Sequence, residues 1–418
     1  MLERDETPQS FDTVPHAQSV DGGHRLDSPV PSHVVSKVLD DDNLLDEILL
    51  RVGFPATLVC TAMVCRRWLG HVSDPKFLSS FRKLHPPCLL GFYVSNVLER
   101  TAPFVPVPTP QHPELASVIQ RASFSLDTYA YRSARTSIVD CWGGNVFMSL
   151  HDYDGGTGYR FAVHRPLCAQ SGLTNFPPLP SHQPQNRILP FVPELLFREE
   201  GGALSYLLID STKERTVVHV YMLQDGVWCM HTSATTEVHG LPLTQKLLLV
   251  DNKVYMCVAS YILVFDLTTL SFSTIQYPQG MGFPEMIMLS QAHDDFGVYL
   301  ICAEELQLAI WLYKGDSWLP VDTICLHEIY DDSRISHHKL VVRHKIRHVG
   351  VNAEFVLLEL DWFVLYLDIK CRTFHKAYEM TIADRHLGYY IHPFMMIWPP
   401  TFPILKNDPT RFPFLSFR

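Results

Sequence analysis

The feature that most constrains the fold of this chain is a repeat of strand, tight turn and strand in its long C-terminal part. Each of four such hairpins carries an aromatic residue just after its turn, and these residues are Trp228, Phe272, Trp318 and Phe374. Their positions differ by 44, 46 and 56 residues. A large apolar residue stands seven positions before each, and these are Tyr221, Phe265, Trp311 and Leu367. The chain therefore repeats a unit that contains at least one hairpin.

Each unit also contains an earlier apolar run that is short enough to be a strand. These runs cover residues 204–209, 254–258, 298–302 and 355–360. A fifth unit fits residues 137–180, with strands near residues 146–150 and 159–163. Polar turns separate the runs, and the spacing of an amphipathic helix disappears from about residue 137 onward.

A period near 45 to 50 residues with three or four strands per unit is typical of β-propeller blades. One such sheet cannot cover both of its own faces, so the units must stack round a ring. Residues 89–94 and 389–398 supply strands for one more unit, which would close the ring and remove exposed sheet edges. We therefore predict an α plus all-β chain, with a small N-terminal helical domain and a β-propeller of about five to six blades. An irregular β-sandwich is the alternative, because the spacing varies.

The helical prediction comes from residues 39–68. Asp40, Asp41 and Asp42 can accept hydrogen bonds from the free N–H groups at a helix start. Apolar residues then recur at one-and-four spacing on one face, namely Leu44, Leu45, Ile48, Leu49 and Val52. Gly53 is suited to end this helix.

A second helical pattern starts at Pro55, a residue suited to a first helical position. Its apolar face runs through Leu58, Val59, Ala62, Met63 and Val64 to Trp68. A third helix is expected after Asp74 and Pro75. A segment of about thirty residues cannot bury enough apolar surface to be stable alone. It must therefore pack on the core of its own chain or on a partner.

The residue types in this segment favour a partner. The segment resembles the F-box, the helical motif by which substrate receptors dock on the Skp-type adaptor of a cullin ubiquitin ligase. The resemblance rests on residues 44–51 (LLDEILLR), on Leu58 and on residues 64–68 (VCRRW). Residues 73–78 (SDPKFL) and 85–93 (HPPCLLGFY) are similar to a large plant F-box family in particular. One position departs from the family pattern, because Asp41 stands where the proline of Leu-Pro is expected, with Leu39 one residue upstream.

The repeat in turn resembles the F-box-associated, kelch-like propellers found downstream of plant F-boxes, although it lacks the double glycines of true kelch repeats. Residues 1–37 contain six acidic residues, four prolines and no apolar run, so we expect a disordered leader there. The resemblance implies an F-box at 38–84 and a propeller-like, substrate-binding domain at 85–418. It also implies the set of residues that bind the adaptor or form the F-box core. These are Leu39, Leu44, Leu45, Ile48, Leu49, Leu58, Val64, Cys65 and Trp68.

Composition narrows the range of partners. The net charge of −10 argues against general nucleic-acid binding, which depends on neutralising phosphates. Ten cysteines are spread singly, which is typical of a reducing compartment rather than of a disulfide framework. The chain shows neither a secretory signal nor an apolar run long enough to cross a membrane. We expect a protein of the cytoplasm, the nucleus or both.

A search for chemical motifs predicts no catalytic residue, no metal and no cofactor. Residues 152–156 (DYDGG) begin like a calcium loop, but Val163 occupies the position where a bidentate carboxylate is needed. The chain contains no Gly-x-Ser-x-Gly elbow and no phosphate loop. Residues 101–114 carry five prolines and are expected to form a surface loop or connector, with a proline-recognition ligand as the alternative.

One strongly basic stretch stands out in this acidic chain. It contains Arg334, Lys339, Arg343, Lys345 and Arg347, with His337, His338, His344 and His348 among them. It is either a solvated strand or loop between blades, or a docking patch for an acidic partner, since opposite charge raises encounter rate and selectivity.

Three functions are open at this point. The first is a substrate-recognition subunit of an SCF-type ubiquitin ligase, which binds a Skp-type adaptor in a cullin complex through the F-box and an unknown target protein through the propeller. Such a receptor performs no chemistry and acts by positioning its target. The second is an interaction scaffold without a role in ubiquitination. The third is a propeller enzyme, which a metal or a pocket of clustered titratable groups would favour.

Overall fold

The structure is a computed structural model of the chain. It describes residues 37–85, 88–96, 102–107, 114–130, 135–151, 159–168, 172–177, 180, 194–198, 204–212, 214–238, 246–279, 281, 287–292, 297–304, 307–327 and 344–396. The chain forms two compact units, Met1–Val52 and Gly53–Arg418. Apart from Lys37, the predicted leader lies outside the described residues.

In the smaller unit, α2 (Asp42–Leu50) begins where the acidic residues predicted a helix start. The Asp41 carboxylate accepts hydrogen bonds from the backbone N–H groups of Asn43 (2.9 Å) and Leu44 (3.1 Å). The apolar stripe divides into two rows with four-residue spacing. Leu45 and Leu49 are fully buried, whereas Leu44 and Ile48 are 46% and 40% exposed.

The larger unit begins with three short helices, α3 (Pro55–Ala62), α4 (Arg66–Val72) and α5 (Pro75–Leu84). The apolar pattern from Leu58 to Trp68 therefore spans two helices. The break occurs because Cys65 has an extended backbone, with φ −158° and ψ 167°, and stands at the start of α4. Helix α5 begins as predicted, and Asp74 accepts hydrogen bonds from the N–H groups of Lys76 (2.7 Å) and Phe77 (3.3 Å).

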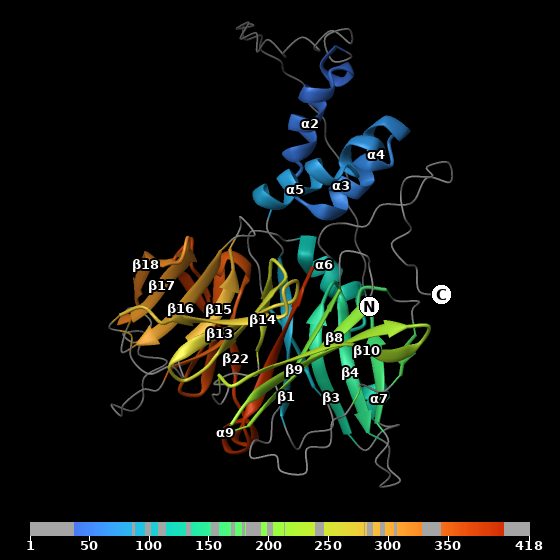
Figure 1. Ribbon diagram of the computed structural model, residues 1–418. Helices are drawn as coiled ribbons and strands as arrows, with labels where there is room; N and C mark the ends of the chain where they lie inside the picture. Colours follow the sequence, from blue (N-terminus) through green and yellow to red (C-terminus); the bar gives the residue numbers. More distant parts are fainter. Residues whose placement is uncertain are drawn as a thin grey trace, which may run out of the picture. The chain divides into compact units, whose positions relative to one another are not determined.

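The described strands of the larger unit form six antiparallel sheets (Figure 1). Sheet 1 consists of β1 (Leu89–Asn96), β2 (Phe104–Pro106) and β23 (Tyr389–Met395). Sheet 2 consists of β3 (Arg135–Trp142), β4 (Asn145–His151), β5 (Tyr159–His164) and β6 (Thr174–Phe176). Sheet 3 consists of β7 (Glu194–Arg198), β8 (Leu204–Ser211), β9 (Thr216–Gln224) and β10 (Val227–Thr236).

The remaining three sheets repeat the four-stranded pattern. Sheet 4 consists of β11 (Leu248–Val250), β12 (Lys253–Cys257), β13 (Tyr261–Asp266) and β14 (Ser271–Gln276). Sheet 5 consists of β15 (Ile287–Gln291), β16 (Val298–Glu304), β17 (Gln307–Lys314) and β18 (Ser317–Cys325). Sheet 6 consists of β19 (His344–Val349), β20 (Phe355–Leu360), β21 (Phe363–Asp368) and β22 (Thr373–Glu379). Successive strands pair within each of these sheets, as in the blades of a propeller.

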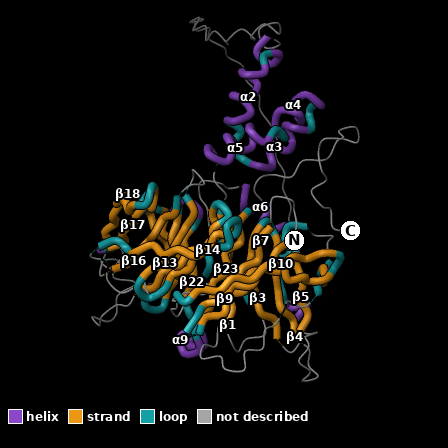
Figure 2. The backbone as a smooth tube through the Cα atoms, viewed as in Figure 1, coloured by secondary structure: helices purple, strands orange, loops and turns teal. Residues whose placement is uncertain are grey.

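Strands dominate the larger unit (Figure 2), and few short helices occur among its described residues. Helices α6 (Glu114–Arg121) and α7 (Asp127–Ala130) lie between β2 and β3 in the sequence. Helix α9 (Ile382–Leu387) connects β22 to β23, and a 3₁₀ turn (Val351–Ala353) connects β19 to β20. No helix in the described part of the chain is long and apolar enough to cross a membrane.

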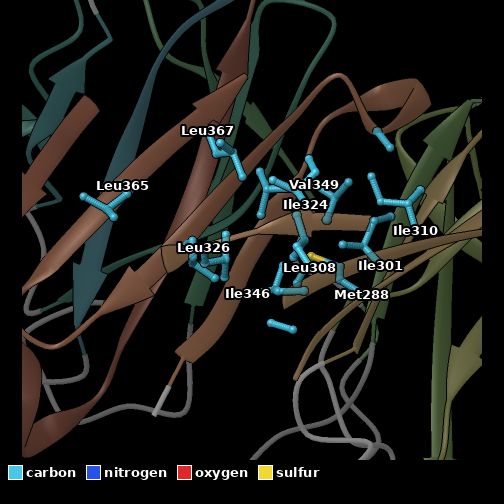
Figure 3. Close-up of a cluster of buried hydrophobic side chains, with 14 of the residues drawn as sticks. Met288, Ile301, Leu308, Ile310, Ile324, Leu326, Ile346, Val349, Leu365 and Leu367 are labelled. Carbon is cyan, nitrogen blue, oxygen red and sulfur yellow. The ribbon is translucent and has the colours of Figure 1, made fainter. Parts of the chain in front are cut away.

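Each pair of neighbouring sheets shares a buried apolar cluster. Between sheets 5 and 6, Ile301, Leu308 and Ile310 pack with Leu358, Leu365 and Leu367 (several of these are labelled in Figure 3). Equivalent clusters join sheets 1 and 2, 2 and 3, 3 and 4, 4 and 5, and 6 and 1. The middle strands are apolar on both faces, because alternate side chains enter the clusters on opposite sides. The larger unit is therefore a six-bladed β-propeller, which confirms the predicted fold class.

The ring closes between the two ends of the propeller sequence, as predicted. Strand β1 pairs with β23, and the register runs from Leu89 opposite Met395 to Asn96 opposite Tyr389. The proline-rich segment contributes β2 to the other edge of β1, so it is more than a connector. Pro106 lies at the end of this outer strand, where a residue without an N–H group is tolerated.

Gly91 permits the close approach of β1 and β2. A Cβ atom at this position would lie 2.4 Å from the Val105 carbonyl oxygen and 2.5 Å from the Phe104 ring. Gly91 stands opposite Pro106 in the register. A larger residue would therefore separate two strands of the closing sheet.

The aromatic repeat marks the outermost hairpins, because Trp228, Phe272, Trp318 and Phe374 each occupy the second residue of a fourth strand. The seven-residue spacing identifies cross-strand partners only in sheets 4 and 6, where Phe265 faces Phe272 and Leu367 faces Phe374. In sheets 3 and 5 two-residue turns with positive φ make the partner Leu223 or Tyr313, five residues earlier.

The tryptophans also connect neighbouring blades. The indole N–H of Trp228 donates to the Pro177 carbonyl (3.1 Å), and that of Trp318 donates to the Gln276 carbonyl (2.7 Å). Pro177 follows the outermost strand of sheet 2, and Gln276 ends the outermost strand of sheet 4. The same position in the repeat therefore makes the same contact to the preceding blade.

The first strands of sheets 3 to 6 have the weakest strand pattern in the sequence. Strands β7, β11, β15 and β19 have only three to six residues and lie far from the hairpin aromatic. First strands of successive sheets contact one another, β11 with β15 and β15 with β19, and β19 and β3 each contact β23. These strands surround the central channel of the propeller.

We expect Gly91→Ala to destabilise the protein by about 1–3 kcal/mol, because overpacking forces two paired strands apart. The matched control is Gly70→Ala in α4, where a Cβ atom would meet nothing within 4 Å. That control should leave stability unchanged or raise it by about 1 kcal/mol, because alanine favours helix. Denaturant unfolding of both variants checks this. Equal stabilities would contradict the role given to Gly91.

Candidate functional site

The predicted adaptor-binding residues of the smaller unit differ in how far their side chains are exposed to solvent. Leu45 and Leu49 are fully buried, and Leu39 is half-buried. Leu44 and Ile48 are large apolar side chains on the exposed row of α2. Apolar residues that gather on a surface mark contact sites.

In the larger unit, Leu58 is fully buried and Trp68 is half-buried. Val64 is 65% exposed, and Cys65 is also exposed. Met63, which sequence reasoning assigned only to a helix face, is 72% exposed. The break between α3 and α4 explains these exposures. Met63, Val64 and Cys65 form the connection between the two helices, so their side chains are not packed against a helix face.

The predicted basic docking patch is only partly described. Arg334, Lys339 and Arg343 lie outside the described residues, and Lys345 is exposed on β19. Arg347 is half-buried and forms an ion pair with Glu359 of β20. Its guanidinium carbon lies 4.0 Å from the centre of the Tyr389 ring, and it donates to the Tyr389 carbonyl (3.2 Å).

These contacts fasten sheet 6 to the closing strand β23. The Tyr389 hydroxyl completes the network by donating to Glu359 (2.9 Å), and burial raises the pKa of Tyr389, so the hydroxyl keeps its proton. The charge of Arg347 is thus compensated within the protein. Among the described residues of the patch, Lys345 is the one left at the surface.

A second group of polar residues was missed by sequence reasoning. Asp140 and Cys141 of β3, Lys246 just before β11, His348 of β19 and His392 of β23 converge on the central channel, and we name them the channel cluster. They come from four different sheets. Sequence analysis named His348 only as part of the basic stretch. Nothing in the sequence links it to Asp140, Cys141, Lys246 or His392 until the blades are assigned.

Two hydrogen bonds tie side chains of the channel cluster to their surroundings. The Lys246 ammonium is hydrogen-bonded to Nδ1 of His348, and Nε2 of His392 lies 3.0 Å from the Ser95 hydroxyl. Asp140 and His348 each follow an irregularity of strand register, at Ile138–Asp140 and at Ile346–His348. Such bulges redirect side chains and are frequent beside functional sites.

Burial shifts every titratable group of the channel cluster. It lowers the pKa of Lys246 to about 8, although Asp140 and Cys141 oppose the shift. Burial and the Lys246 charge lower the pKa of His392 to about 3 and hold that of His348 well below its usual range. Burial also raises the pKa of Asp140 and, well above its ordinary value, that of Cys141. Both imidazoles are therefore neutral at pH 7.

A separate hollow of about 420 Å³ opens on sheet 5. Its lining combines one large aromatic side chain with amides, a carboxylate and small residues, namely Gln279, Met281, Cys302, Glu304, Gln307, Ala309, Trp311 and Thr323. No group of three or more His, Cys, Asp or Glu side chains placed to hold a metal occurs in the described ranges.

We expect Arg347→Met to destabilise the protein by about 2 kcal/mol, because it leaves Glu359 without its ionic partner. Lys345→Met, a change of the same type two residues away, should alter stability by less than about 0.5 kcal/mol. Thermal or denaturant unfolding compares the two. Equal effects would show that Arg347 is not structural.

The channel histidines should make stability depend on pH. Their pKa in the folded state lies below the unfolded value of about 6.5, so the unfolded state binds more protons and stability falls as pH drops from about 6.5 toward 3. Removing one such group by His392→Gln should reduce the loss between pH 7.5 and 5.5 by about 1 kcal/mol. Denaturant unfolding at both pH values measures this, and an unchanged loss would contradict a buried neutral imidazole.

Comparison with known proteins identifies the propeller. A family model described as "F-box protein AT5G49610-like, beta-propeller" matches residues 137–402, more than half of the chain. No curated protein matches the chain.

Solved structures with some similarity include proteins from three bacteria. A protein from Lactobacillus plantarum is 13% identical with a TM-score of 0.33, and the match covers 60% of this chain and 72% of that one. TolB from Acinetobacter baumannii is 11% identical with a TM-score of 0.35, and the match covers 68% of this chain and 62% of that one. A functionally unknown protein from Desulfotomaculum acetoxidans is 9% identical with a TM-score of 0.35, and the match covers 62% of this chain and 75% of that one. Scores this low carry no argument about function.

The family match covers sheets 2 to 6 and extends to β23 of the closing sheet. It agrees with the repeated sheets from β3 to β22, whereas β1 and residues 44–68 precede the matched residues. The chain belongs to the family of F-box proteins with an AT5G49610-like β-propeller.

Proposed function

We propose that this protein is the substrate-recognition subunit of an SCF-type cullin ubiquitin ligase. Residues 38–84 would act as the F-box and bind a Skp-type adaptor, and residues 85–418 would form the domain that binds the target protein. The observation that carries the proposal is membership of an F-box propeller family, together with the F-box-like residues 44–51 and 64–68 ahead of the propeller.

The exposed apolar residues support an adaptor contact. Leu44, Ile48, Met63 and Val64 each expose 40% or more of their surface, which is unfavourable in water unless a partner covers them. Leu45, Leu49 and Leu58 are fully buried and would contribute to the F-box core. The resemblance alone did not separate these two roles, and burial now suggests the division.

In this proposal the chain performs no chemistry itself. It raises the effective concentration of the target near a ubiquitin-charged enzyme in the complex. The channel cluster bears on the enzymatic alternative, but burial keeps the Cys141 thiol protonated and therefore a poor nucleophile. Asp140 is the one carboxylate of the cluster, so these residues support no acid–base pair of carboxylates.

Two further expectations belong to the proposal. Lys345 at the surface of β19 remains part of a proposed docking patch for an acidic partner. The expected location is the cytoplasm, the nucleus or both, and this is supported by ten cysteines that are all free thiols.

The test uses substitutions at exposed positions, so that folding is preserved. Ile48→Asp should weaken binding of the full chain to a Skp-type adaptor by about tenfold or more, because an isoleucine side chain buried at an interface contributes about 2 kcal/mol. Val64→Asp should have a similar effect. Calorimetric or surface-based titration of purified adaptor measures both.

The matched control is Ile382→Asp on α9, where the isoleucine is 68% exposed on the propeller. This variant should bind the adaptor like the unaltered protein. If Ile48→Asp and Ile382→Asp recover equal amounts of adaptor, the adaptor contact does not involve α2. If the unaltered chain recovers none, the protein is a scaffold of another kind.

A further inference from the structure

The channel cluster has the composition of a ligand site that adaptor binding does not use. Lys246 is hydrogen-bonded to the imidazole of His348, and the imidazole of His392 is hydrogen-bonded to the hydroxyl of Ser95. The charge of Lys246 acts on both imidazoles. These groups come from β1, β19, β23 and the segment before β11. A site assembled from three separate strands and one connecting segment is held by several blades of the propeller, so its geometry is pre-organised.

The cluster is both surrounded by protein and reachable by solvent. Lys246 is exposed, and Asp140, Cys141, His348 and His392 are half-buried, so a water-sized molecule touches all five. Yet loss of hydration is the largest influence on each of these groups. The first strands of a propeller surround a central channel, so β3, β19 and the segment before β11 place these groups where solvent can enter the ring.

Hydrogen-bond chemistry decides which ligand fits. Nδ1 of His348 accepts from the Lys246 ammonium, so the proton of this neutral imidazole lies on Nε2, which becomes a donor. The ammonium carries three N–H donors, and its bond to His348 uses one of them. A cation with neighbouring N–H donors in a poorly hydrated space favours an anionic oxygen.

We propose that the channel cluster binds the oxyanion group of a small molecule, a phosphate or a carboxylate, with Lys246 as the charged contact and His348 and His392 as the adjacent polar contacts. The charged or titratable groups that act on them from the described side chains are Asp140 and Cys141 of β3. Asp140 opposes the ligand, because its carboxylate is the competing partner of Lys246.

The proposal makes binding depend on pH in a stated direction. An anion beside Lys246 and the imidazoles stabilises their protonated forms, so binding takes up protons. Affinity for a ligand of constant charge must therefore rise as pH falls from about 8 to about 6. Acetate keeps a single charge over this range and is the suitable probe.

The experiment titrates the full chain with inorganic phosphate, and separately with acetate, against sodium chloride at matched ionic strength. Calorimetry and thermal unfolding report binding. We expect saturable binding of at least one oxyanion and none of chloride. The preferred probe tells whether the site suits a phosphate or a carboxylate.

Two variants with opposite expected effects test the assignment. Lys246→Met should weaken oxyanion binding by about tenfold or more, whereas Asp140→Asn should strengthen it by removing a competing anion. Lys345→Met, an exposed lysine of β19, is the control and should bind like the unaltered protein.

Equal binding by Lys246→Met and the unaltered chain overturns the proposal, as does the absence of saturable binding. If Lys246→Met does not fold, the pH dependence of acetate binding to the unaltered chain decides. Affinity that does not change with pH rejects the site. Adaptor binding by the same samples tests the ubiquitin-ligase proposal independently, because no residue of the channel cluster belongs to the F-box.

Discussion

The structure of the larger unit depends on the pairing of β1 with β23. The middle strands of every sheet are apolar on both faces, so each sheet needs two neighbours, and six shared clusters supply them. Without the β1–β23 ladder, sheets 2 and 6 would each lack the neighbour that sheet 1 provides. Joining two strands about 300 residues apart is not prohibitive, because each doubling of a loop adds only about 0.6 kcal/mol.

Two contacts of the closing sheet leave little room for substitution. Gly91 leaves room for the Val105 carbonyl, and Arg347 joins Glu359 to Tyr389 at the start of β23. Both features act at the place where the two ends of the propeller sequence meet. A residue that sequence analysis placed in a docking patch therefore belongs in part to the closure of the ring.

The side chains near the axis of the propeller are polar, unlike those packed between its blades. Apolar clusters fill the spaces between sheets, but β3, β19 and β23 carry the polar residues Asp140, His348 and His392, and Lys246 lies just before β11. Polar groups so poorly hydrated are costly unless they satisfy one another or a ligand. The hydrogen bonds to Ser95 and between Lys246 and His348 provide part of that satisfaction, and an oxyanion would provide more.

The blade repeat, the closure of the ring and the helix starts at Asp41 and Asp74 could be predicted from the residues alone, because they depend on neighbours in the chain or on a regular period. The F-box resemblance could also be seen there, and the family match supports it through the propeller. Which apolar residues are exposed, such as Leu44 beside the buried Leu45, depends on packing and could not be predicted. The same holds for the grouping of Asp140, Lys246, His348 and His392, because these residues are far apart in sequence and become neighbours only once the ring has closed.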